Sequence, residues 1–281
     1  MASLLDSPIT EPILLVDTSY YCFYRFYALK KWFYFSHKEY SDREKKDTLD
    51  EWFKHPDCLT KYKTMFHKSI MTICKKRKIP LKNIIFCRDC KQKDIWRTKL
   101  YPKYKSQRDY TNFEGGDFFA HSYKTILPEF EKTLNIKTVF IESVEADDIV
   151  AKFKNLIRDE NPLRDIYILA SDMDYLQVLD EHTFLITCAN KILNHKSVGD
   201  PTVDLLIKII CGDSSDFIPG CFKRCGKKTA FKYATQKEEL EKAFSKSPGS
   251  KEQFLFNQRL IDFNYVPIDL QDKIQKAFLE I

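Results

Sequence analysis

Short apolar segments, most of them followed closely by an acidic residue, recur along this chain and constrain its fold more than any other feature. They lie at residues 13–16, 83–87, 138–141 and 165–170. Helical patterns separate them, at residues 64–77, 125–134 and 147–158. Continuous apolar strands that alternate with amphipathic helices are typical of βαβ units. The sequence therefore predicts an α/β fold with a mainly parallel central sheet flanked by helices.

The pattern changes after about residue 190, where the chain becomes helical and rich in lysine. We therefore expect an α/β core over residues 1–190 and a helical subdomain over residues 191–281. Within the first part, residues 20–63 should form a long helix followed by a charged excursion, and residues 109–122 a loop or mobile lid. With 7 Gly and 11 Pro among 281 residues, a turn-rich all-β sandwich is excluded.

The cellular setting is also constrained by composition. No apolar run approaches the roughly 18–20 residues of a membrane span. The N-terminal residues 1–12 lack the basic and apolar regions of a secretory signal. The nine cysteines are scattered and odd in number, which favours free thiols over a disulfide framework or a structural zinc site. We therefore expect an intracellular protein in a reducing compartment, without a membrane partner.

Acidic residues gather where the predicted strands end and where the helical part begins. The carboxyl ends of parallel strands meet at one edge of a sheet, where open α/β proteins bind their ligands. Taken singly, each acid has an ordinary alternative role in a helix first turn, a helix cap or an Asx-turn. Taken together, they would bring nine carboxylates to one pocket: Asp17, Asp89, Glu145, Asp147, Asp148, Asp172, Asp174, Asp213 and Asp216.

Carboxylates packed together without counter-charge raise each other's pKa and destabilise the fold. Hard divalent cations, which take oxygen ligands, are the usual solution. Two such ions side by side form the phosphoryl-transfer clamp of many nucleases and phosphatases. The acids therefore predict a site for two Mg²⁺ ions, with Mn²⁺ as a substitute.

Two basic segments favour a polyanionic partner, in a chain whose net charge is +6. Residues 96–108 place five cations among Trp96, Tyr101 and Tyr104. Cations interleaved with rings suit a frayed single strand of nucleic acid, although a solvated helix face is the alternative. A further run, residues 75–78, is expected to be a solvated helix end rather than a nuclear-localisation signal.

The second basic segment surrounds two glycines at residues 220 and 226. Turn glycines followed by a helix can direct backbone N–H groups and a helix N-terminus at a phosphate. The candidate contacts of this segment are Gly220, Lys223, Arg224, Gly226, Lys227, Lys228 and Thr229.

The ordered motifs ILLVDTS, YPKYKSQR, EADD, SDMDYLQ, GDSSDFIPG and GKKTA resemble those of the structure-specific 5′-nuclease family. This family includes flap endonucleases, phage 5′→3′ exonucleases, ribonuclease H-type relatives and the 5′-nuclease domain of bacterial DNA polymerase I. The resemblance spans roughly residues 12–235 and implies a PIN-like nuclease core. It also implies a basic gateway or arch at about 96–130 and a helix-three-turn-helix at about 211–235 that grips duplex DNA and can hold K⁺.

The resemblance implies roles for individual residues. Asp17, Asp89, Glu145, Asp147 and Asp172 would surround one metal. Asp174, Asp213 and Asp216 would complete the second site, with Asp148 close to both. Lys105 matches the family's active-site lysine, with Arg97 and Arg108 as companions. Tyr104 would stack near the scissile nucleotide, Trp96 belongs to the same gateway, and Arg25 would face the phosphates.

The sequence also departs from the family pattern. Cys87-Arg88-Asp89-Cys90 stands where the family has Phe-Asp-Gly, and Phe222-Lys223-Arg224-Cys225 stands between the two turn glycines. The excursion at residues 31–61 has no counterpart in the family that we can align.

The reaction implied is hydrolysis of a phosphodiester near a single-strand/duplex junction, leaving a 5′-phosphate. The substrate would be DNA with a 5′ end or flap, and the protein a monomer acting in replication or repair. Alternatives are a nuclease that removes RNA primers from hybrids, an inactive junction-binding protein, and a Mg²⁺ phosphatase of the haloacid-dehalogenase type. The last needs a second acid where this chain has Ser19.

Overall fold

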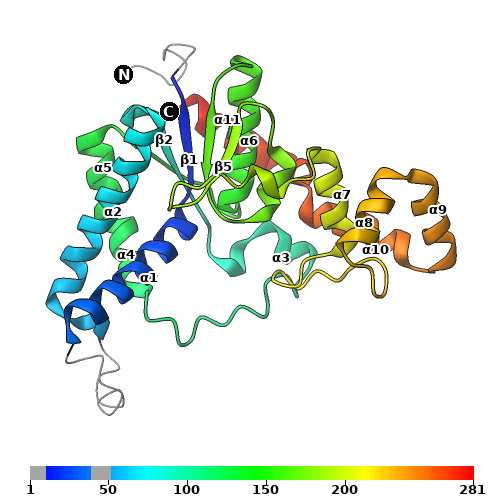
Figure 1. The fold of residues 1–281 in the computed structure, drawn as a ribbon, viewed down its shortest axis with the longest axis horizontal. Helices are drawn as coiled ribbons and strands as arrows, with labels where there is room; N and C mark the ends of the chain where they lie inside the picture. The colour runs from blue at the N-terminus through cyan, green and yellow to red at the C-terminus, as the bar shows by residue number, and fades with distance from the viewer. Residues whose placement is uncertain (1–10, 39–51) are drawn as a thin grey trace.

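A computed structural model describes residues 11–38 and 52–281 of the chain (Figure 1). Two expectations fall on the other residues. The expectation about a secretory signal concerns residues 1–12, and residues 1–10 lie outside the described part of the chain. The middle of the charged excursion, residues 39–51, also lies outside it.

The centre of the molecule is a five-stranded sheet in the order β3-β2-β1-β4-β5. Its strands are β1 (Ile13–Asp17), β2 (Ile84–Arg88), β3 (Lys137–Phe140), β4 (Ile166–Leu169) and β5 (Thr183–Ile186). All four pairings are parallel, and Val16 of β1 lies beside Phe86 of β2 and Leu169 of β4. The parallel sheet and four of its strands confirm the prediction. Strand β5 was not predicted, because it is short and no acid follows it.

Alternate residues of the strands pack on opposite faces of the sheet. On one face, Leu14 and Phe86 join a core made with helices α1 (Thr18–Ser36), α2 (Pro56–Arg77), α4 (Gly116–His121) and α5 (Leu127–Leu134). On the other face, Leu15 and Ile85 pack with α6 (Ala146–Glu160) and α11 (Ile268–Leu279). Burial on both faces explains why the strands are continuously apolar rather than alternating.

Short helical segments connect the main elements. They are the helix α3 (Trp96–Leu100), the π-helical turn Ser122–Ile126, and the 3₁₀ turns Trp52–Lys54, Leu81–Asn83, Gln92–Asp94, Met173–Val178, Asn194–Lys196 and Phe263–Tyr265. Among residues 11–38 and 52–281, none of the helices combines the length and the apolar character of a membrane span.

The segment predicted as a loop at residues 109–122 is partly helical, which corrects that prediction. Helix α4 occupies its second half because Phe118 is fully buried in the core of α1 and α2. Just before it, Glu114 accepts hydrogen bonds from Lys30 Nζ (2.7 Å) and Trp52 Nε1 (2.9 Å). These contacts fasten the end of the loop to α1.

The C-terminal part is helical, as expected, and extends to one side of the sheet (Figure 1). Its helices are α7 (Pro201–Cys211), α8 (Lys227–Thr235), α9 (Lys237–Lys246) and α10 (Ser250–Ile261). The last helix, α11, returns to the sheet, where Phe278 meets Phe153 of α6 edge-on with ring centroids 5.2 Å apart. The division at residue 190 stays a prediction.

One buried amide joins α10 to α7 and to the turn that follows it. Asn257 has no exposed surface, and its Nδ2 donates to the carbonyls of Ile209 (2.9 Å) and Pro219 (2.8 Å). Leaving buried carbonyls without a donor costs about 1–3 kcal/mol. We expect Asn257→Ala to lower the melting temperature by roughly 2–8 °C, measured by circular dichroism. Asn155→Ala, at an exposed position of α6, is the control, and an equal effect of the two changes would contradict this role.

Candidate active site

Acids lie at the carboxyl edge of the sheet because three strands end on or close to an aspartate that accepts a backbone N–H at the start of a helical segment. Asp17 ends β1 and accepts the Tyr20 N–H at 2.9 Å. Asp89 follows β2 and accepts the N–H of Ala146, the first residue of α6, at 2.8 Å. Asp172 follows β4 and accepts the Asp174 N–H at 3.0 Å. The predicted convergence of strand ends therefore occurs, and it includes acids from three strands.

Burial and mutual repulsion disturb the titration of these acids. Burial and the charge of Asp89 raise the pKa of Asp17 to about 7. Burial and the charge of Asp172 raise the pKa of Asp174 to about 7 as well. Burial and Glu145 raise the pKa of Asp147 well above its ordinary value. The positive charge near these carboxylates does not offset their burial and mutual repulsion, and their oxygen atoms are the donors that hard divalent cations prefer.

Arg97 neutralises the acids at the start of α6 from beneath the site. Its guanidinium donates to both carboxylate oxygens of Asp148 (2.6 and 2.8 Å), to Glu145 Oε2 (2.7 Å) and to the Leu260 carbonyl (2.7 Å). Only 1% of Arg97 is exposed. The structure therefore places Arg97 differently from the expectation that it meets the substrate, because its donors are already used inside the protein.

Lys105 pairs with the same cluster from the pocket side. Its ammonium contacts Glu145 Oε1 and lies 3.8 Å from Asp216 Oδ2. Burial alone would raise the pKa of Glu145, but Lys105 and Arg97 lower it to about 2. Lys105 has a left-handed backbone (φ 55°), and Gln92 Nε2 donates to its carbonyl at 2.8 Å. Lys105 is thus held at a fixed place beside the acids.

The segment around Lys105 is fastened to residues 214–217 of the C-terminal part. Arg108 Nη2 donates to Asp216 Oδ1 (2.6 Å), and the Lys105 N–H donates to the Asp216 carbonyl (3.1 Å). Tyr101 Oη and Gln107 Nε2 donate to the carbonyls of the neighbouring residues Phe217 and Ser214. Asp216, which was expected to complete the second metal site with Asp174 and Asp213, therefore pairs with the gateway cations Lys105 and Arg108.

Lys208 is a site residue that the sequence analysis missed. Its Nζ lies 2.5 Å from Asp174 Oδ1 and 2.5 Å from Asp213 Oδ2. Burial alone would lower the pKa of Lys208, but these two carboxylates raise it. Its place one turn before the Gly-Asp motif, on the last turns of α7, is the signal that could have identified it.

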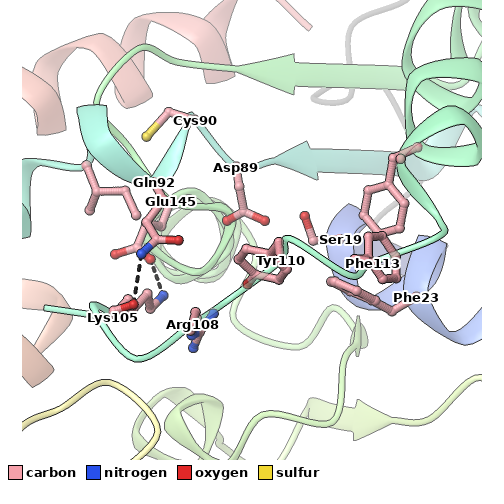
Figure 2. Close-up of a pocket in the computed structure, with 13 residues that line it drawn as sticks. Ser19, Phe23, Asp89, Cys90, Gln92, Lys105, Arg108, Tyr110, Phe113 and Glu145 are labelled. Carbon is pink, nitrogen blue, oxygen red and sulfur yellow. Dashed lines mark hydrogen bonds and ion pairs between the residues drawn. The ribbon is translucent and has the colours of Figure 1, made fainter.

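A pocket of about 350 Å³ opens beside Asp89, Glu145 and Lys105. Figure 2 shows Asp89 and Glu145 on one side of it and the rings of Phe23 and Phe113 on the other. Lys105, Arg108 and Tyr110 reach it from the loop that joins α3 to α4. The pocket thus combines carboxylates, cations and aromatic surface, as a site for a phosphate ester with an attached base requires.

Three residues expected to contact DNA are buried instead. Trp96 is 7% exposed and donates from Nε1 to Asp148 Oδ2 at 2.9 Å. Tyr104 is 4% exposed and donates from Oη to Glu145 Oε2 at 3.1 Å. Arg25 is 9% exposed and lies over the Tyr24 ring at 4.6 Å. Trp96 and Tyr104 therefore support the acids of the site from within the protein, and Arg25 packs on the Tyr24 ring, so none of the three is presented to a nucleotide.

The second basic segment lies at the surface, as expected. The exposed residues are Gly220, Lys223, Arg224, Gly226, Lys227, Lys228 and Thr229. Position 220 requires a glycine because the backbone there passes close to Cys211, and a Cβ would lie 2.8 Å from the Cys211 carbonyl oxygen. Gly226 is the N-cap of α8, so the positive end of that helix points out of the protein among lysines.

The family model of the 5′-3′ exonuclease N-terminal resolvase-like domain matches residues 12–202. The chain belongs to the 5′-3′ exonuclease family. It is therefore a nuclease, a hydrolase of phosphodiester bonds, and the phosphatase alternative is wrong. A 5′-3′ exonuclease of Mycoplasmopsis pulmonis is 30% identical over 75% of this chain and 74% of its own. DNA polymerase I of Streptococcus pneumoniae is 27% identical, but the match covers 57% of this chain and 18% of the polymerase.

Solved structures share the fold. The bacteriophage T5 5′-exonuclease, in a structure with bound divalent metal ions (zinc), has a TM-score of 0.68 and 20% identity. The match covers 96% of this exonuclease and 99% of that chain. The T5 flap endonuclease in a pseudo-enzyme-product complex with DNA and metal ions also has a TM-score of 0.68, with 18% identity. The predicted nuclease-like fold is confirmed.

The raised pKa of Asp17 predicts how the metal-free exonuclease responds to pH. An ordinary aspartate titrates near 3.8, so Asp17 stabilises the fold in its protonated form, and this stability is lost as pH rises through about 7. Asp17→Asn keeps a cap for Tyr20 and has no charge to bury. In EDTA at pH 8 we expect it to melt about 2–5 °C above the wild type. The difference should shrink toward pH 5.

The control for this prediction is Asp272→Asn, at an exposed position of α11. Scanning calorimetry at a series of pH values is the measurement. A difference between Asp17→Asn and the wild type that does not change with pH would contradict the stated cause.

Proposed function

We propose that this exonuclease hydrolyses DNA near single-strand/duplex junctions, at a 5′ end or a 5′ flap, with two Mg²⁺ ions as cofactors and Mn²⁺ as a substitute. The observation that carries the proposal is the edge of the sheet where acids from successive strands meet and raise each other's pKa. The T5 structures with metal ions and with DNA support it. The polymerase relatives support a role in replication or repair.

The oxygen donors fit two hard cations. We assign Asp17, Asp89, Glu145, Asp147 and Asp172 to the first ion, directly or through water. Asp174 and Asp213 belong to the second ion. Asp148 and Asp216, which form ion pairs with Arg97 and Arg108, are assigned to the border between the two ion sites. Lys208, which now lies between Asp174 and Asp213, supplies positive charge that the second ion would share or displace.

Bound cations would supply Lewis-acid activation of a water molecule and offset the charge that develops on the phosphate. The remaining work belongs to the protein. Lys105 and Arg108 line the pocket and can exchange a carboxylate for nonbridging phosphate oxygens. Arg97 acts as a positioning residue, because it fixes Glu145 and Asp148 without reaching the pocket.

Duplex DNA is proposed to bind at residues 211–235, where the N-terminus of α8 and its exposed lysines would meet phosphates. A K⁺ ion held by backbone carbonyls of the turn before α8 is part of this proposal. We also propose a monomer in a reducing intracellular compartment, with all nine cysteines present as thiols. An RNA/DNA hybrid is a second substrate to test on the same pocket.

The assignment of Asp172 is tested by Asp172→Asn. Cleavage of a 5′-flap duplex in Mg²⁺ should fall by at least about 100-fold, because a metal ligand is lost. Binding to the flap, measured by fluorescence anisotropy in Ca²⁺, should change by less than about three-fold. EDTA should abolish cleavage by the wild type.

Matched single strand, blunt duplex and an RNA-containing flap are the substrate controls, and Asp272→Asn is the variant control. Wild-type binding without cleavage in Mg²⁺ and Mn²⁺ would establish the inactive junction-binding alternative. Parallel loss of binding and cleavage in Asp172→Asn would reject the ligand assignment.

The duplex-binding segment is tested by a Lys227→Ala, Lys228→Ala double variant. We expect duplex binding to be about 10-fold weaker. The slope of log affinity against log salt concentration should fall by the equivalent of about one to two phosphate contacts. Titrations at several salt concentrations measure both quantities. Lys237→Ala, Lys242→Ala, on helix α9, is the matched control, and equal losses in the two double variants would contradict a local contact.

A further inference from the structure

A histidine and aspartate cluster lies where the end of α1 meets the start of α2 (Figure 1). His37 directly follows α1, His55 is the N-cap of α2, and Asp57 is in the first turn of α2. Asp57 Oδ2 lies 4.0 Å from His37 Nε2 and 3.8 Å from His55 Nδ1. These three ligand atoms all fall within 4.8 Å of one another.

The hydrogen bonds of the cluster direct nitrogen lone pairs toward Asp57. His37 Nδ1 lies 3.2 Å from the Phe33 carbonyl, which can only accept, so Nδ1 carries the proton. The Nε2 of neutral His37 is then a lone-pair donor on the side of Asp57. His55 Nδ1 accepts the Asp57 N–H over a long 3.3 Å contact, so its lone pair faces Asp57, and a bound cation would replace this weak helix cap.

Aromatic packing holds both rings. Phe33 stacks on His37 with centroids 4.3 Å apart, and it meets His55 edge-on at 5.4 Å. The two imidazoles are 4.7 Å apart. The cluster is therefore supported by a buried ring, while the Asp57 side chain is two-thirds exposed.

We propose that His37, His55 and Asp57 bind a borderline divalent cation of the zinc type. Two imidazoles and one carboxylate suit Zn²⁺, Co²⁺, Ni²⁺ or Cu²⁺, whereas Mg²⁺ prefers oxygen alone. Ligand atoms around tetrahedral zinc are roughly 3.3 Å apart. The separations of 4.0 and 3.8 Å that involve Asp57 need to close by less than 1 Å, and the exposed Asp57 side chain can move that far. The two histidine ligand atoms lie within 4.8 Å of each other, so the imidazoles would also move closer together. Water would complete the coordination.

This site is chemically and spatially distinct from the acidic pocket. Asp17, one of the acids at the carboxyl edge of the sheet, is the N-cap at the other end of the 19-residue helix α1, roughly 28 Å away along the helix axis. A cation at His37 and His55 would fasten the end of α1 to the start of α2. Joining two segments that are separated in the sequence removes conformational freedom from the unfolded chain. The proposed site is therefore structural and does not take part in hydrolysis.

The test uses the full chain in millimolar Mg²⁺, which occupies sites built from oxygen ligands. Co²⁺ and then Zn²⁺ are titrated, with visible absorption, calorimetry and melting temperature as readouts. We expect one equivalent of Co²⁺ to give the intense bands of a nitrogen-ligated ion of low coordination number. We expect Zn²⁺ to displace it and to raise the melting temperature.

The variants are His37→Gln and His55→Asn, the second of which keeps a capping side chain. Each should weaken Zn²⁺ binding by at least about 10-fold and remove the rise in melting temperature. His67→Gln, at an exposed position of α2, is the matched control and should bind like the wild type. Asp57→Asn provides a further variant if either histidine change disturbs folding.

Unchanged Zn²⁺ affinity in the histidine variants would overturn the proposal. So would a wild type that shows no intense cobalt bands in Mg²⁺, a result that does not depend on how any variant folds. Nuclease activity is not the readout, so the test is independent of the proposed function.

Discussion

The repulsion among carboxylates crowded at one edge of the sheet is the constraint on which the rest of this exonuclease depends. A parallel sheet places every strand end on the same side, and the turns that follow use acids as helix caps. The acids that cap the helices therefore also concentrate negative charge at this edge of the sheet. Burial prevents water from screening it, so the charge must be met by cations of the protein or by bound metal.

The protein meets part of this charge from segments far away in the sequence. Arg97 and Lys105, from the region after β2, neutralise Glu145 and Asp148. Lys208, from α7, neutralises Asp174 and Asp213. Asp17, Asp89 and Asp172 lie between these two groups of ion pairs, and no lysine, arginine or histidine side chain among the described residues forms an ion pair with them. Divalent cations are therefore most strongly favoured beside these three carboxylates, whose negative charge no ion pair compensates in the part of the chain that the structure describes.

Much of this arrangement could be predicted from sequence, because local signals determine it. Apolar strands, helix periodicity and acids at strand ends are read within a few residues, and they gave β1 to β4 and the set of acids. The partners of those acids could not be read in the same way. Whether Arg97 faces substrate or Asp148 depends on packing against Leu260, which lies 163 residues further along the chain. Strand β5 was not predicted because it is short and no acid follows it. The place of Lys208 before the Gly-Asp motif is a local signal, but its pairing with Asp174 of a different element depends on the assembled fold.

The loop between α3 and α4 is tied at both ends, and this has a consequence for where the enzyme cuts. One end is joined to residues 214–217 through Tyr101, Lys105 and Arg108, and the other to α1 through Glu114. Lys105 therefore cannot shift relative to the acids unless the turn leading to α8 shifts with it. This connection would set the distance from the proposed duplex contact to the reacting phosphate. The site of cleavage would then depend on its distance from the junction in nucleotides and not on the nucleotide sequence.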